Sequence, residues 1–398
     1  MSIKFYITED DMCTTQKLNL ARVQKWIEKN KGSITEDPDL ADFVLCQTCN
    51  GWSLLEDNSY ERIKKFSKSH KDKMIVMGCI NDAHPEKLKK IWDGPTVRTK
   101  TDKPYSFSEI EKFFPNFSHT LESIPAQSVF RRKEDYREFN LKKRFLNIAE
   151  GCSFNCSFCT HKPGLGERRS RPLDDILRQA RNCIDDGAEI LNLMGMETSL
   201  WGVEFGSSYP KLLEEVLKLD KNIQVHVAQF QPTGIKRYYD DLLKLFSNKR
   251  VTDIQLPIQS TSQRIMRMMK RQELSQYVGP FMQELRKRNP RSVLRTDLII
   301  CWPTETAKER IDTLNFAGKY FDEIALYTIE LSPDLPAWKY KKDALNEKDT
   351  EKIRLESKNY LLTNFPNVFV HSGQQDDDSM GAAEKKRIEL RKKKYSLA

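Results

Sequence analysis

The sequence predicts an α/β protein with a small N-terminal open parallel sheet domain, a partial (β/α)6 barrel and a short, mostly helical, charged C-terminal extension. Apolar runs alternate with helical patterns near the N-terminus, the alternation returns from Arg144 onward, and the pattern changes after about Lys339. Such alternation is typical of parallel sheets whose strands are connected by helices. We therefore expect a first domain at 1–95, a connector at 96–140, the barrel at 141–338 and the extension at 339–398.

The N-terminal domain is predicted to contain three strands, at residues 3–7, 43–45 and 74–77, and helices at 16–28 and 59–69. A cysteine lies shortly beyond each strand: Cys13 after the first, Cys46 and Cys49 after the second, and Cys79 after the third. Because the loops beyond the carboxyl ends of parallel strands share one edge of the sheet, three cysteines distant in sequence are expected to meet there. Scattered buried cysteines are the alternative.

The following segment, residues 94–140, has little periodicity and is interrupted by Pro95, Pro104, Pro115 and Pro125. Prolines at this density favour loops over regular elements. We expect a connector that is wrapped over the surface.

The barrel segment shows six strand–helix units. Apolar runs predict strands at 145–148, 190–193, 223–227, 253–256, 293–300 and 323–327, and helices are expected to start near residues 173, 211, 236, 263 and 306. Six such units are typical of a partial barrel that is open on one side. Catalytic groups of barrels lie on the loops that follow the strands.

The loop after the first barrel strand carries Cys152, Cys156 and Cys159 in the spacing C-x-x-x-C-x-x-C. Three thiolates can hold a four-iron cluster and leave one iron open to bind a substrate. A zinc site would show paired C-x-x-C knuckles and a fourth ligand, and His161, the only local candidate, has the wrong spacing. Three unrelated buried thiols are the remaining alternative.

The C-terminal extension predicts a helix at 347–362, a short strand at 368–370, an acidic flexible stretch at 373–381 and a highly charged helix or tail at 382–394. The basic residues of this tail could contact phosphate or an acidic partner. A solvated terminus is the commoner explanation for such a charge run.

Composition indicates an intracellular enzyme. The chain has 398 residues, nine cysteines and a formal net charge of +9. No apolar stretch is long enough for a signal peptide or a membrane span, so we expect a cytoplasmic protein without a membrane partner. Reducing compartments keep thiols free, which favours metal ligation over disulfides. The positive charge is only weak evidence for an RNA partner.

In their order and spacing, these motifs resemble the methylthiotransferase family of radical S-adenosylmethionine (SAM) enzymes over residues 1 to 335. The N-terminal motifs are Met12-Cys13, Gln47-Thr48-Cys49 and Val76-Met77-Gly78-Cys79. The barrel motifs run from Ala149 to Cys159, from Arg169 to Pro172, from Leu256 to Ser260 and from Arg295 to Ile299.

The resemblance implies two [4Fe-4S] clusters, with SAM as the second cofactor. Cys152, Cys156 and Cys159 would hold the cluster that binds SAM. Cys13, Cys49 and Cys79 would hold an auxiliary cluster that donates or carries sulfur, with Cys46 as a spare thiol. The implied reaction replaces an unactivated C–H bond by C–S–CH3 and consumes two SAM molecules. Cys183 and Cys301 are expected to be ordinary buried cysteines.

Five further residues are candidates for SAM contacts. Glu197 is expected at the methionyl ammonium and Arg171 at the methionyl carboxylate, for which its planar fork is suited. Gln259 and Ser260 could bind the ribose or the carboxylate, and Phe158 is expected to pack near the adenine or the cluster. The alternatives are a surface carboxylate, a surface salt bridge and a loop cap.

The chain also departs from the family. No C-terminal β-barrel is apparent, and residues 301–306 and 332–336 differ from the usual turns. The substrate is therefore expected to be a peptide or protein side chain, slightly ahead of a tRNA adenosine. We expect a monomer that receives electrons from a reductase such as flavodoxin or ferredoxin. Two alternatives are a radical SAM enzyme that crosslinks or oxidises peptides, with an electron-transferring auxiliary cluster, and a non-catalytic iron–sulfur protein.

Overall fold

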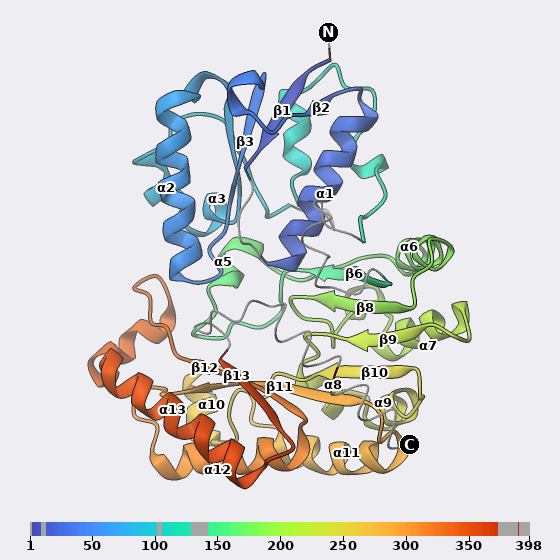
Figure 1. Ribbon diagram of the computed structural model, residues 1–398, viewed down its shortest axis with the longest axis vertical. Coiled ribbons are helices and arrows are strands. Elements are labelled where there is room, and N and C mark those ends of the chain that lie inside the picture. Colours follow the sequence, from blue (N-terminus) through green and yellow to red (C-terminus); the bar gives the residue numbers. More distant parts are fainter. Residues whose placement is uncertain (1, 9–12, 102–105, 129–141, 373–388, 390–398) are drawn as a thin grey trace. The chain divides into compact units, whose positions relative to one another are not determined.

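The computed structural model describes residues 2–8, 13–101, 106–128, 142–372 and 389 (Figure 1). The chain divides into two compact units. The first unit contains residues 1–133, 149–153 and 160–171, and the second contains residues 134–148, 154–159 and 172–398.

The first unit is built on a five-stranded, all-parallel sheet in the order β2-β1-β3-β4-β5. Its strands are β1 (Lys4–Ile7), β2 (Ser33–Ile34), β3 (Phe43–Thr48), β4 (Met74–Gly78) and β5 (Thr96–Val97). Its helices are α1 (Thr14–Lys29), α2 (Ser53–Ser69), α3 (Ile80–Ala83), α4 (Pro85–Lys89) and α5 (His161–Leu165), with short 3-10 turns η1 (Pro38–Leu40), η2 (Lys71–Lys73), η3 (Ser108–Phe113) and η4 (Leu121–Ser123). The predicted open parallel sheet is confirmed.

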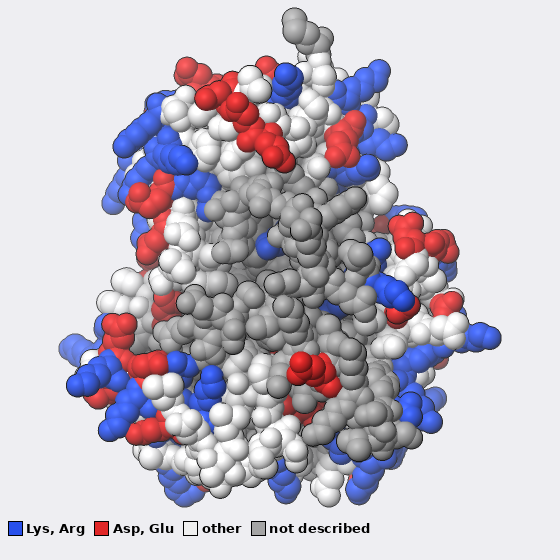
Figure 2. Space-filling view, viewed as in Figure 1, with Lys and Arg blue, Asp and Glu red and all other residues white. Residues whose placement is uncertain are grey.

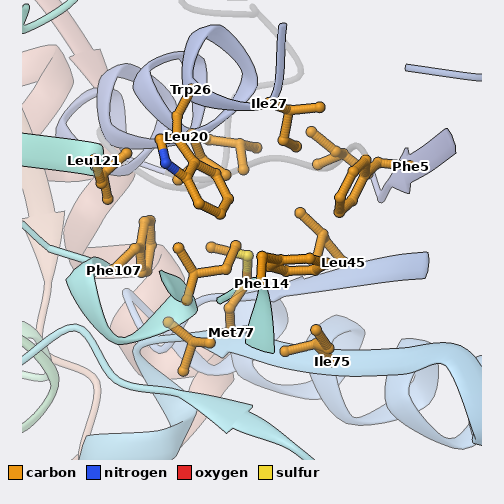
Figure 3. Packing of buried hydrophobic residues seen from close by; sticks show 14 of the residues in the cluster. Phe5, Leu20, Trp26, Ile27, Leu45, Ile75, Met77, Phe107, Phe114 and Leu121 are labelled. Carbon is orange, nitrogen blue, oxygen red and sulfur yellow. The ribbon is translucent and has the colours of Figure 1, made fainter. Parts of the chain in front are cut away.

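Each face of this sheet is covered by its own apolar core. On one face, Trp26 of α1 packs with Phe5, Leu45 and Phe114, as Figure 3 shows. On the other face, side chains of α2 and the segment after β4 cover β3 and β4. Burial on both faces explains why the strands are continuous apolar runs.

The connector predicted after residue 94 differs from the structure. β5 pairs in parallel with β4, and residues 107–124 contribute Ile110, Phe114 and Leu121 to the core beside α1. The Trp26 indole Nε1 donates a hydrogen bond to the backbone oxygen of His119 at 2.7 Å. This segment lacks helical or strand periodicity, but the apolar residues between its prolines pack into the core.

The second unit contains the barrel strands in the order β13-β12-β11-β10-β9-β8-β6. The strands are β6 (Lys143–Glu150), β8 (Ile190–Gly195), β9 (Gln224–Val227), β10 (Val251–Gln255), β11 (Val293–Ile300), β12 (Glu323–Thr328) and β13 (Phe369–Ser372). The last two residues of β6 belong to the first unit, where they pair with the antiparallel strand β7 (Arg169–Ser170). All six predicted barrel strands are present, so the partial barrel is confirmed.

The helices of the second unit follow the strands. They are α6 (Leu173–Asp185), α7 (Tyr209–Leu219), α8 (Pro232–Arg237), α9 (Tyr239–Phe246), α10 (Gln263–Met268), α11 (Ser275–Arg288), α12 (Ala307–Tyr320) and α13 (Glu347–Asn364), with 3-10 turns η6 (Val203–Phe205) and η7 (Pro336–Asp343). The sequence prediction did not separate α8 from α9 or α10 from α11.

The C-terminal extension is part of the barrel sheet. The predicted helix is α13, and the predicted short strand is β13, which pairs in parallel with β12 from Glu323 opposite Phe369 onward. The acidic stretch predicted at 373–381 lies outside the described residues, and so does the charged tail predicted at 382–394 except for Glu389.

Basic and acidic side chains lie among one another over the described part of the face drawn in Figure 2. Among the described residues, no helix is both long and apolar enough to cross a membrane.

Candidate metal centres

The three N-terminal cysteines follow the carboxyl ends of β1, β3 and β4. Cys13 is the N-cap residue of α1 and Cys79 that of α3, while Cys49 directly follows β3. Cys49 is 4% exposed, Cys79 is 3% exposed, and Cys13 is partly buried. The thiol of Cys79 interacts electrostatically with those of Cys49 and Cys13. The topology thus brings together three thiols that are far apart in the sequence, and none of them is in a disulfide.

Backbone N–H groups lie near two of these sulfur atoms. Those of Gln16 and Thr15 lower the pKa of Cys13, and those of Gly51, Cys13 and Asn50 lower the pKa of Cys49. A backbone N–H close to a cysteine sulfur favours the thiolate form.

Burial nevertheless raises the thiol pKa values. Removal from water, and then the neighbouring Cys49, raise the pKa of Cys13 to about 12. Burial also raises the pKa of Cys49, and burial followed by Cys49 and Cys13 raises the pKa of Cys79 well above its usual value. Buried thiolates that repel one another are stabilised by a bound cation. This donor set therefore fits an iron cluster.

The segment that follows Cys159 in the sequence lies against the N-terminal cysteine loops within the first unit. The Asn50 side-chain amide donates to the Thr160 backbone oxygen at 2.7 Å, and the Thr160 hydroxyl donates to the Gly51 oxygen. A Cβ on Gly164 would lie 2.9 Å from the Cβ of Cys79, so only glycine fits there. Sequence reasoning did not find this packing, because it joins residues more than 80 positions apart.

A buried carboxylate, Glu150, also faces this site. It ends β6 and is fully buried, it accepts a hydrogen bond from the Ser106 hydroxyl, and it interacts electrostatically with Cys13 and Cys79. Arg169 lies 3.8 Å from its Oε2 atom. The sequence signal that was missed is an acidic residue at the end of an apolar strand, directly before Gly151-Cys152.

Cys152 is held by the first unit through its backbone. Its N–H donates to the Gly166 oxygen at 3.1 Å, and its carbonyl oxygen accepts a hydrogen bond from the Lys162 ammonium. The preceding Gly151 has φ +69°, and a Cβ there would lie 2.1 Å from the Glu167 oxygen. Glycine is thus required for the chain to turn from β6 into the cysteine loop.

Cys156 and Cys159 belong to the second unit. The N–H of Cys159 donates to the Cys156 oxygen at 3.2 Å, which makes a tight turn between them. Ser157 anchors this turn, because its N–H donates to the Met269 oxygen at 3.0 Å and its hydroxyl donates to the Met268 oxygen at 2.8 Å.

All three cysteines of this loop are partly buried, so their thiols are not sealed in the core. In the described ranges, no three His, Cys, Asp or Glu side chains lie close enough to hold a single metal ion. Cluster thiolates bind different irons, so they do not need to meet at one point.

The predicted SAM contacts have individual environments. Glu197 is fully buried after β8, and its Oε1 atom accepts hydrogen bonds from the Ser199 hydroxyl at 2.7 Å and the Leu200 N–H at 2.9 Å. Gln259 has φ +66°, and its buried Oε1 atom has no hydrogen-bond partner among the described residues. Glu197 is therefore not a surface carboxylate, and Gln259 has an unused acceptor.

The other three predicted contacts are also buried or packed. Ser260 accepts from the Ser262 N–H at 3.1 Å, which corresponds to a loop cap. Arg171 is 1% exposed and lies in the first unit, so it is not in a surface salt bridge. The Phe158 ring lies 6.0 Å from the Trp302 ring and packs against an apolar cluster of the second unit.

Polar pairs between neighbouring barrel strands were not predicted. Arg295 binds Asp253 through Nε at 2.7 Å, and Gln255 donates to Asp297 at 2.9 Å. Burial raises the pKa of Asp297, and Arg295 opposes this rise. The available signal was the alternation of charged and apolar residues in β10 and β11, which places the charged side chains on one face of the sheet.

Two family models match the chain. The model of the Radical SAM superfamily matches residues 146–317, which include Cys152, Cys156 and Cys159. The model described as Uncharacterized protein family UPF0004 matches residues 9–96, which include Cys13, Cys49 and Cys79.

Relatives align over most of the chain. A probable threonylcarbamoyladenosine tRNA methylthiotransferase of Methanothermobacter thermautotrophicus is 24% identical over 366 residues, covering 89% of this chain and 82% of the relative. The ribosomal protein uS12 methylthiotransferase RimO of Aquifex aeolicus is 26% identical over 318 residues, covering 78% and 69%.

Among solved structures, the radical SAM methyltransferase TsrM from Kitasatospora setae, with cobalamin and a [4Fe-4S] cluster bound, matches with a TM-score of 0.67. It covers 100% of both chains at 11% identity. At this identity the likeness concerns the fold alone.

Proposed function

Because the chain belongs to the methylthiotransferase family of radical SAM enzymes, we propose that it replaces a C–H bond of its substrate by C–S–CH3, using two [4Fe-4S] clusters and two SAM molecules per turnover. The chain is an enzyme of the sulfur-group transferase type, and its family implies [4Fe-4S] clusters and SAM as cofactors.

The meeting of Cys13, Cys49 and Cys79 at one edge of the first unit's sheet carries this proposal. A radical SAM enzyme needs only one cluster to cleave SAM, and a second set of three thiols supplies a place for the sulfur. Backbone N–H groups near Cys13 and Cys49 lower the pKa of these thiols and so favour the thiolate form that a cluster requires.

Each cysteine set has its own task in this proposal. Cys152, Cys156 and Cys159 hold the cluster whose open iron binds SAM, and Cys13, Cys49 and Cys79 hold the sulfur-carrying cluster. When bound and reduced, a [4Fe-4S] cluster supplies the electron that cleaves SAM and generates the hydrogen-abstracting radical.

Five residues are proposed to orient the cofactor. We assign Glu197 to the methionyl ammonium, because a positively charged partner stabilises a buried carboxylate strongly. Gln259 is assigned to the ribose, because its buried Oε1 atom needs a hydrogen-bond donor. Three contacts remain predictions: Arg171 to the methionyl carboxylate, Ser260 to the ribose or the carboxylate, and Phe158 to the adenine or the cluster.

For the substrate we propose a peptide or protein side chain. The RimO relatives are named for ribosomal protein uS12. On the face drawn in Figure 2, the described basic and acidic side chains are intermingled and do not form one basic surface. A tRNA adenosine is the second candidate, because the Methanothermobacter thermautotrophicus relative, which aligns with 89% of this chain, is named for tRNA. The flavodoxin or ferredoxin donor and the monomeric state remain predictions.

The test is to incubate anaerobically reconstituted protein with SAM, dithionite and either a uS12-derived peptide or bulk tRNA. We expect 5′-deoxyadenosine together with a CH2S mass increment on one substrate. The absence of 5′-deoxyadenosine contradicts the enzyme proposal. A loss of hydrogens without added sulfur indicates crosslinking or oxidation and contradicts thiomethylation.

A further inference from the structure

A histidine lies beside the N-terminal cysteine set. His161 is the first residue of α5 and belongs to the same unit as Cys13, Cys49 and Cys79. Its Nε2 atom and the Cys49 sulfur each lie 3.5 Å from the point where a Cβ on Gly51 would stand. The two atoms are therefore at most twice that distance apart.

The position of His161 is fixed by its neighbours. Thr160 binds both Asn50 and Gly51, the two residues that follow Cys49. At the other end of α5, Gly164 packs against Cys79, and its carbonyl oxygen accepts a hydrogen bond from the Thr99 hydroxyl at 2.5 Å. The helix is thus held at two of the three cysteine loops, and its first side chain remains next to the Cys49 sulfur.

The His161 imidazole has no hydrogen-bond or ion-pair partner among the described residues, although its side chain is partly buried. Two other histidines of the first unit, His70 and His84, differ in this respect. His70 binds Asp39 at 2.9 Å, and His84 binds Glu56 at 3.2 Å. A partly buried imidazole without a partner, next to a thiol that is proposed to bind iron, has a nitrogen available as a ligand.

We propose that His161 is the fourth protein ligand of the N-terminal cluster and binds, through Nε2, the iron that the three cysteines leave open. Imidazole is an established iron ligand in iron–sulfur centres, and a neutral ring adds no charge to a site that already holds three thiolates and Glu150. This inference rests on the proposed function, because it assumes that Cys13, Cys49 and Cys79 hold a cluster.

A histidine ligand would protect the sulfur-binding position. Imidazole binds iron less strongly than sulfide does in a soft-ligand site, so incoming sulfide would displace His161 by simple ligand exchange. No electron is transferred in this exchange, and the imidazole leaves as a neutral ring. His161 would thus cap the open iron between turnovers.

The experiment uses the full chain with Cys152, Cys156 and Cys159 replaced by alanine, so that only the N-terminal cluster can form. The protein is reconstituted anaerobically, freed of excess sulfide and reduced with dithionite in the absence of SAM. Pulsed EPR is then recorded on material containing either 14N- or 15N-histidine. We expect the hyperfine coupling of a directly bound nitrogen, which changes on 15N substitution and disappears when sulfide is added.

Two variants in this background separate the outcomes. His161→Asn is expected to remove the nitrogen coupling and to speed iron loss to a chelator by about tenfold or more. His119→Asn, which changes an exposed histidine of the same unit, is expected to leave both unchanged. The His161 assignment alone is overturned if the coupling persists in His161→Asn. It is also overturned if the background protein, with His161 present, forms a cluster that shows no nitrogen coupling. If the background protein binds no iron, the two-cluster function fails instead.

Discussion

The two cysteine sets are built in different ways. Cys152, Cys156 and Cys159 lie in one short loop, and Gly151 and Ser157 fix its backbone. Cys13, Cys49 and Cys79 come from three separate strand ends and meet only because β1, β3 and β4 are adjacent and parallel. A local loop can be read from residue spacing, whereas the N-terminal set depends on the topology of a whole domain.

The largest effect is expected at the loop set. Cys159→Ser removes an iron ligand, and since even the loss of an outer contact costs 10 to 100-fold in metal sites, we expect 5′-deoxyadenosine formation to fall by at least about 100-fold. Chromatographic quantification of 5′-deoxyadenosine after incubation with SAM and dithionite measures this. Cys183→Ala, a cysteine buried in α6, is the control and should retain the activity. Equal losses in both variants would mean that the spacing of the loop is irrelevant.

Cys49→Ala separates the two sets. We expect the thiomethylated product to disappear, while 5′-deoxyadenosine formation stays within about twofold of wild type, because SAM is cleaved at the other cluster. Mass spectrometry of the substrate and chromatography of the nucleoside report the two results. Cys46→Ala is the matched control, since Cys46 lies on β3, the strand that Cys49 follows, but in the core that faces α2. Loss of product in Cys46→Ala but not in Cys49→Ala would assign the ligand to the other cysteine.

Substitutions of two glycines compare the effect on stability of the cysteine loop with that of an ordinary helix end. Gly151→Ala is expected to lower the free energy of unfolding by about 3 kcal/mol and to reduce iron binding, because its Cβ meets the Glu167 oxygen and its φ is positive. Gly187→Ala also has a positive φ but nothing within 4 Å, so about 1 kcal/mol is expected. Urea unfolding and iron analysis measure both. A similar cost at the two positions would show that backbone strain alone matters in the loop.

The smallest effect concerns stability in the barrel unit, at the start of α12. Burial raises the pKa of Glu305 to about 7, and the N–H of Cys301, which donates to it, opposes this rise. A raised native pKa means that stability from the neutral carboxyl is present at low pH and is lost as the pH increases from about 4.5 through 7. Glu305→Gln should therefore be more stable than wild type at pH 8 by up to about 2 kcal/mol, with little difference at pH 4.5.

The control for this pH experiment is Glu309→Gln, in the first turn of α12. Arg264 holds the pKa of Glu309 well below its usual range, so this variant should lose stability that the wild type has above pH 4.5. Urea unfolding at several pH values measures both variants. The same pH trend in the two variants would contradict the assignment of opposite shifts.

The sequence predicted the parts of the molecule that are periodic. All six barrel strands and the three long N-terminal strands show apolar runs, and they were predicted within a few residues. Residues 107–124 were not predicted to be buried, because the packing of Ile110 and Phe114 beside Trp26 depends on contacts distant in the sequence. The burial of Glu150 and the position of His161 beside Cys49 were missed for the same reason, since a single polar residue in a strand or loop has no periodic signal. The Arg295–Asp253 pair was missed although the alternation in β10 and β11 carried a signal for it.

The number of clusters is tested most directly by iron analysis of anaerobically reconstituted protein. We predict about eight irons per chain in the wild type and about four in each of two triple variants, one lacking Cys13, Cys49 and Cys79 and the other lacking Cys152, Cys156 and Cys159. About four irons in the wild type, unchanged when Cys13, Cys49 and Cys79 are replaced, would contradict a second cluster and with it the proposed sulfur transfer.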